Sequence, residues 1–131
     1  MACQTEYHAY DTDVSGAKDI HSRNIPRIEE LCAGKGEIRF AFLSDTQRWY
    51  DEAEDAVRSI NQRTDIDFVV HGGDMSDWSL RDEFERQRDI LEGLKVPYVV
   101  IIGNHDCLVT GEMVYRKLFG DPHFAFTAGE V

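Results

Sequence analysis

Three apolar segments of this chain each end in a short polar tip that carries a carboxylate or an amide. They are EIRFAFLSD at residues 37–45, IDFVVHGGD at 66–74 and YVVIIGNHD at 98–106. Asp74 follows Asp45 by 29 positions, and Asn104 follows Asp74 by 30. Each interval matches one strand–helix–strand crossover, a unit of about 30 residues or more. The pattern therefore predicts parallel strands joined by helices, because such a crossover returns the chain to the same edge of the sheet.

Segments with the helical spacing of apolar residues alternate with these apolar runs. We predict helices at residues 24–32, 51–63, 79–94 and 113–120, and strands near residues 38–43, 67–71, 98–102 and 124–127. Continuous apolar strands indicate a sheet that helices cover on both faces. The predicted fold class is therefore α/β, with a largely parallel sheet and flanking helices.

The composition limits the domain organisation and the partners. Residues 1–24 are polar without a period, so we predict an N-terminal tether followed by one folded unit over residues 25–131. The formal net charge of −11 at pH 7 argues against general nucleic-acid binding and is compatible with divalent cations. No apolar run approaches the roughly 20 residues of a transmembrane helix.

The three cysteines, Cys3, Cys32 and Cys107, fit neither a zinc motif nor a disulfide framework. We expect Cys32 and Cys107 to be free thiols that pack against their neighbours. Only Met1 and Ala2 precede Cys3. If those two residues are not native, Cys3 is the first residue of a processed lipoprotein outside the cytoplasm. Otherwise Cys3 lies in the disordered terminus of a cytoplasmic protein.

The three polar tips are expected to converge. Asp45, Asp74 and Asn104 each follow a parallel strand, so they are predicted to lie side by side at the carboxyl end of the sheet, where open α/β sheets bind ligands. Oxygen donors gathered there suit a hard or borderline divalent cation. Any one of these residues alone is also typical of a turn or a helix cap.

The tips SDTQ, GGDMSD and GNHD, in this order and spacing, resemble the first three motifs of the calcineurin-like metallophosphoesterase superfamily over about residues 37–126. The resemblance implies the first half of a four-layer α/β/β/α sandwich. It also implies that Asp45 binds one metal ion, that Asp74 bridges two, and that Asn104 binds the second.

The same resemblance implies two catalytic residues and a reaction. His105 would face the phosphate, and Asp106 would orient His105 by accepting its other ring N–H. The implied reaction is hydrolysis of a phosphate monoester or diester by a water that bridges two divalent metal ions. The substrate would be a small phosphate ester.

This chain departs from the family pattern in two ways. Gln47 stands where the first motif usually has a histidine, and an amide oxygen tilts the site toward manganese, magnesium or calcium, although iron and zinc stay open. The later histidine ligands of the family are absent from the sequence. We therefore expect weak activity from this chain, which resembles the N-terminal part of a domain. The alternative is a metal-binding or interaction module without turnover. A haloacid-type phosphotransferase with Asp45 as nucleophile needs a second aspartate where Gln47 stands.

Several neighbouring residues are expected to have structural rather than functional roles. His71 is expected to be a core histidine, Asp77 a cap of the following helix, and His123 a surface turn residue. Three aromatic residues after the first two motifs either line a substrate rim or pack beneath loops: Trp49, Tyr50 and Trp78. His8 and His21 lie in the predicted tether and suggest no function. A sheet without its second half is expected to expose apolar surface and to self-associate.

Overall fold

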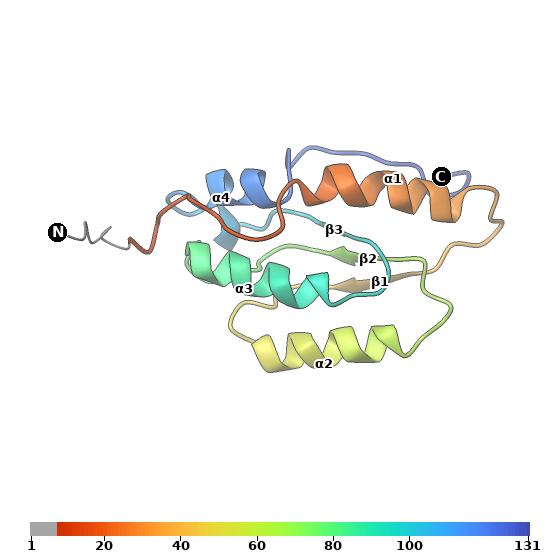
Figure 1. The fold of residues 1–131 in the computed structure, drawn as a ribbon, viewed down its shortest axis with the longest axis horizontal. Helices are drawn as coiled ribbons and strands as arrows, with labels where there is room; N and C mark the ends of the chain where they lie inside the picture. The colour runs from red at the N-terminus through yellow and green to blue at the C-terminus, as the bar shows by residue number, and fades with distance from the viewer. Residues whose placement is uncertain (1–7) are drawn as a thin grey trace.

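Three parallel strands form the centre of the fold in a computed structural model that describes residues 8–131 (Figure 1). The strands are β1 (Phe40–Leu43), β2 (Phe68–His71) and β3 (Tyr98–Val100). They lie in the order β1-β2-β3, with Phe40 opposite Phe68 and Val69 opposite Tyr98. The predicted α/β class and the parallel sheet are therefore confirmed. The prediction for Cys3 lies outside the described residues.

Within residues 8–131, four α-helices and one short 3₁₀ helix surround the sheet: α1 (Ile20–Cys32), α2 (Tyr50–Asn61), α3 (Arg81–Glu92), η1 (His105–Cys107) and α4 (Gly111–Leu118). Helices α2 and α3 begin at the carboxyl end of the sheet, where α4 also lies (Figure 1). Within residues 8–131 no helix is long and apolar enough to cross a membrane.

The predicted fourth strand at residues 124–127 is wrong, because that segment forms no strand in the described part of the chain. Side chains already form hydrogen bonds with the backbone groups along the outer edge of β3. The N–H of Val100 donates to His21 Nε2 at 3.0 Å, and its carbonyl accepts from the Tyr115 hydroxyl at 2.6 Å. Asn24 donates to the carbonyl of Tyr98 at 2.8 Å. Two helices thus occupy the hydrogen-bonding positions that a further strand would need.

Helix α1 begins four residues before its predicted start. The helix was predicted to start at Asn24, but α1 begins at Ile20 and Asn24 lies buried inside it. The predicted boundary between tether and folded unit therefore falls inside α1. The segment before α1 also packs, because Val14 is buried and Arg88 donates to the carbonyl of Ser15 at 2.6 Å.

The two faces of the sheet differ in how well they are covered. One face packs with α1, α3 and α4 in the main core, whose large members include Phe84, Tyr98, Tyr115 and Phe119. On the other face Phe68 and Val99 contact α1, whereas Phe40 and Phe42 remain 54% and 62% exposed. The predicted exposure of apolar sheet surface is thus present on this face.

Candidate metal centre

The loops that follow the three strands are hydrogen-bonded to one another. The N–H of Asp45 donates to the carbonyl of Gly73 at 3.0 Å, and the N–H of Gln47 donates to the carbonyl of Asp74 at 3.3 Å. The N–H of His105 donates to the Asp74 side-chain Oδ1 at 3.0 Å. The loop after β2 therefore lies between the other two, with Asp74 in contact with both.

Two glycines allow these loops to approach so closely. A Cβ at Gly103 would lie 2.1 Å from Asp74 Oδ1 and 2.3 Å from the Asp74 nitrogen. Gly73 has φ +102°, and a Cβ there would lie 2.8 Å from the nitrogen of Gly103. Any side chain at either position would force the second and third loops apart.

Backbone strain is concentrated in the same loops. Asp45 and Asp74 have φ 57° and 55°, which places both in the left-handed region that costs a non-glycine residue energy. Three further residues of these loops share the left-handed conformation: Arg48, Ser79 and Val109. Strained residues that cluster in this way are typical of functional sites.

Asp106 is fully buried and has a different role from the predicted one. Its carboxylate accepts hydrogen bonds from the N–H of Ser76 at 2.9 Å, the Ser76 hydroxyl at 2.8 Å and the N–H of Gly103 at 3.1 Å. The N–H of Met75 donates to it at 3.3 Å. Burial raises the pKa of Asp106, while these donors oppose the rise. Asp106 therefore joins the second loop to the third, and the prediction that it orients His105 is wrong.

His105 is oriented by Asp77 instead. Its Nδ1 donates to the Asp77 carbonyl at 2.9 Å, and this hydrogen bond raises the pKa of His105. With the proton on Nδ1, the neutral ring presents Nε2 as an acceptor. The Asp77 carboxylate pairs with Arg48 at 3.0 Å. Asp77 is thus not the predicted helix cap.

The beginning of α3 is organised by Glu83. Its carboxylate accepts the N–H groups of Asp77, Trp78 and Leu80 at 3.1–3.2 Å. Glu83 lies three residues after Leu80, at the position that a glutamate occupies in a capping box. The usual sequence signal also needs a polar capping residue where Leu80 stands, so neither Glu83 nor Arg48 is marked by the sequence.

The predicted metal ligands supply oxygen donors only. Asp45 and Asn104 are exposed at the tips of the first and third loops. Gln47 Oε1 is buried and has no hydrogen-bond partner among the described residues. A buried polar oxygen normally has a partner, and a bound cation would supply one here. Residues 8–131 contain no metal-binding group of three or more His, Cys, Asp and Glu side chains. The candidate set has two carboxylates and two amides, and its chemistry fits a hard divalent cation.

His71 is a buried core histidine, as expected. Its Nδ1 accepts the N–H of Gly73 at 3.1 Å, so its Nε2–H donates to Thr46 Oγ1 at 2.8 Å. Burial lowers the pKa of His71 to about 4, which keeps the ring neutral. His71 therefore links the first loop to the second from beneath.

The remaining predictions divide between confirmed and wrong. Cys32 is buried and His123 is exposed in a turn, where its N–H donates to Asp121 Oδ1 at 2.8 Å, both as expected. Cys107 is exposed, so its predicted packing is wrong. Tyr50 lies under the guanidinium of Arg86, 3.8 Å from the ring centroid.

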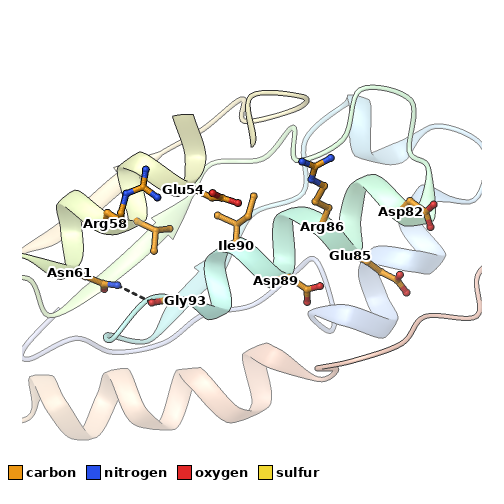
Figure 2. Close-up of a pocket in the computed structure, with 10 residues that line it drawn as sticks. Glu54, Arg58, Asn61, Asp82, Glu85, Arg86, Asp89, Ile90 and Gly93 are labelled. Atoms are coloured by element: carbon orange, nitrogen blue, oxygen red, sulfur yellow. Dashed lines mark hydrogen bonds between the residues drawn. The ribbon is translucent and has the colours of Figure 1, made fainter. Parts of the chain in front are cut away.

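A groove of about 660 Å³ lies away from these loops, between α2 and α3 (Figure 2). Its wall is mostly charged and includes Glu54, Arg58, Glu85 and Arg86. The amide of Asn61 donates to the Gly93 carbonyl at 2.8 Å across one end, as the dashed line in Figure 2 marks. No predicted site residue lines this groove.

A match to a known protein family covers the loops at the strand ends. The model of the calcineurin-like phosphoesterase family matches residues 38–128, a range that contains all three loops. The chain therefore belongs to the calcineurin-like phosphoesterase family. One relative is a probable cyclic nucleotide phosphodiesterase from Rhodopseudomonas palustris, with 35% identity over 81 residues. That match covers 53% of this chain and 30% of the relative, so the chain spans less than a third of the relative's length.

Proposed function

We propose that this chain carries the first part of a metal-dependent active site that hydrolyses phosphate esters. The hydrogen bonds that join the three strand-tip loops around Asp74 support this proposal most strongly, because these loops carry the candidate oxygen donors. Membership of the phosphoesterase family supports the same reaction class.

Four residues would hold two divalent ions: Asp45, Gln47, Asp74 and Asn104. Such ions, when bound, would activate water and neutralise the charge that develops on the phosphoryl oxygens. Asp74 would bridge them, because it lies between the other two loops. The strained backbone of Asp45 and Asp74 would keep both carboxylates in place before any ion binds.

His105 would act on the phosphoryl group from the third loop. The hydrogen bond from its Nδ1 to Asp77 fixes the ring and favours the protonated imidazole. A protonated ring would stabilise charge on the phosphoryl oxygens or donate a proton to the leaving oxygen. Asp106 would contribute indirectly by holding the second and third loops together.

The substrate would be a phosphate monoester or diester. The relative's name as a probable cyclic nucleotide phosphodiesterase supports a diester. Four ligands are few for two ions, which usually take about four to six each. We therefore expect this 131-residue chain to bind its metals loosely and to turn over slowly.

A manganese-supplemented assay with p-nitrophenyl phosphate and its bis-ester tests this function. We expect slow turnover that a chelator abolishes, that Asp74→Asn removes, and that the exposed control Asp51→Asn on α2 retains. Turnover that survives both chelation and Asp74→Asn would contradict the proposed site. Manganese binding without turnover of either ester would favour the non-catalytic metal-binding module.

We also propose that copies of this chain associate through the exposed sheet face. Phe40 and Phe42 are more than half exposed on that face, and an apolar cavity of about 410 Å³ is lined by Phe40 and Phe126. Burial of this surface against a second copy would be favoured by the hydrophobic effect.

A further inference from the structure

Both tryptophans of the chain expose their indoles beside the candidate site. Trp49 is 61% exposed and Trp78 is 53% exposed, and neither belongs to a core cluster. Trp49 and Trp78 are the only tryptophans in the sequence. Of the two alternatives for these tryptophans, packing beneath loops is therefore wrong.

An ion pair places the two tryptophans on adjoining loops. Arg48 Nε lies 3.0 Å from Asp77 Oδ2, and each tryptophan directly follows one member of that pair. The Asp77 carbonyl accepts the His105 Nδ1 proton at 2.9 Å. The residues beside both tryptophans are thus tied to the histidine that would face the phosphate.

Hydrogen bonds hold the main chain at both tryptophans. The N–H of Trp49 donates to the Thr46 carbonyl at 3.1 Å, and the N–H of Trp78 donates to Glu83 Oε2 at 3.1 Å. An ordered main chain at both positions reduces the conformational entropy that is lost when a ligand stacks on the indoles.

We propose that Trp49 and Trp78 form a stacking platform for a planar aromatic group on the substrate's phosphate ester. This inference rests on the proposed function, because it assigns the substrate class of the same site. An exposed indole suits a flat ring better than an alkyl chain, since a stack needs contact with only one ring face. The substrate would thus be an aryl or nucleoside phosphate.

Intrinsic fluorescence tests this directly, since all indole emission comes from these two residues. The ligands are adenosine 5′-monophosphate, phenyl phosphate, methyl phosphate and adenosine, each titrated into the manganese-loaded chain. We expect both ring-bearing phosphates to change the emission and to bind more tightly than methyl phosphate. Tighter binding of one of the two would identify the ring as a nucleobase or as a simple aryl group.

Variants separate the platform from the phosphate site. Trp49→Ala or Trp78→Ala, measured by calorimetry, should weaken binding of the ring-bearing phosphates by about 5- to 100-fold, the range for one lost stack. Methyl phosphate affinity should not change. Trp→Phe should restore much of the loss, and the exposed control Leu31→Ala on α1 should have no effect.

Two results distinguish failure of this inference from failure of the proposed function. Equal binding of all three phosphates, unchanged in both alanine variants, would overturn the platform and leave the phosphate site intact. Binding of adenosine that depends on the tryptophans, with no effect of any phosphate group, would support the platform and contradict the phosphoesterase site. Emission that responds to no ring-bearing ligand would overturn the platform.

Discussion

At the residue scale, Asp106 shows how a buried carboxylate can serve a site without touching a reacting atom. It accepts three backbone N–H groups and one hydroxyl, from residues 75–76 and from Gly103. Leaving buried donors unsatisfied costs about 1–3 kcal/mol each. Asp106 therefore stabilises the arrangement of the loops that follow β2 and β3. The hydrogen bond to the Asp77 carbonyl orients His105.

His21 gives the fold a dependence on pH. Burial lowers its pKa from 6.5 to about 4, so the folded state favours the neutral ring that accepts the Val100 N–H. Its contribution to stability is complete above pH 6.5 and is lost as the pH falls through about 4. The displaced pKa corresponds to about 3 kcal/mol in the free energy of unfolding.

Denaturant unfolding across this pH range measures the effect. His21→Gln, whose amide oxygen can accept the same N–H, should lose less stability between pH 6.5 and 4 than the parent chain. The exposed control His123→Gln should follow the parent. Parallel curves for His21→Gln and the parent would show that His21 does not carry this dependence.

The motifs made several site residues predictable from the sequence. Residues whose role depends on distant contacts could not be predicted in this way. Asp45, Asp74 and Asn104 follow apolar runs at crossover spacing, a pattern visible in the sequence. The partner of a buried carboxylate such as Asp106 depends on contacts about 30 residues away in the chain, which no local pattern records. Arg48 was missed for the same reason.

At the element scale, the site depends on loops that pack backbone against backbone. Gly103→Ala would place a methyl group 2.3 Å from the Asp74 nitrogen, so the second and third loops must separate. We expect this variant to lower the free energy of unfolding by about 1–3 kcal/mol, the usual cost of overpacking. Thermal and denaturant unfolding would measure the loss.

Gly36→Ala is the matched control for Gly103→Ala. A Cβ at Gly36 would meet no heavy atom within 4 Å, and so its stability should be close to that of the parent. Equal stability of the two variants would mean that the second and third loops are not in the close contact described.

The sheet also shows where sequence patterns fail for whole elements. The three strands were predictable because each apolar run is flanked by turn residues and amphipathic helices. Residues 124–127 show a similar apolar pattern, yet they form no strand, since His21, Asn24 and Tyr115 bond to the edge of β3. Whether side chains from distant helices occupy the hydrogen-bonding groups of a strand edge depends on the tertiary structure, which a local sequence pattern does not record.

At the scale of the whole molecule, one sheet face remains apolar and open. Light scattering over a range of concentrations should show self-association of the 131-residue chain, reduced by Phe42→Ser. Met113→Ser removes a comparably exposed apolar residue from α4 and should leave association unchanged. A parent chain that stays monomeric, or equal effects of both variants, would contradict association through this face.

Calorimetric titration with manganese tests the metal centre most directly. The parent chain should bind manganese. Asp74→Ala should abolish binding more completely than Gln47→Ala, because a bridging carboxylate supplies charge that an amide lacks. Equal losses in the two variants, tighter binding by Asp74→Ala, or no binding by the parent would contradict the central claim that the strand-tip loops form a metal site around Asp74.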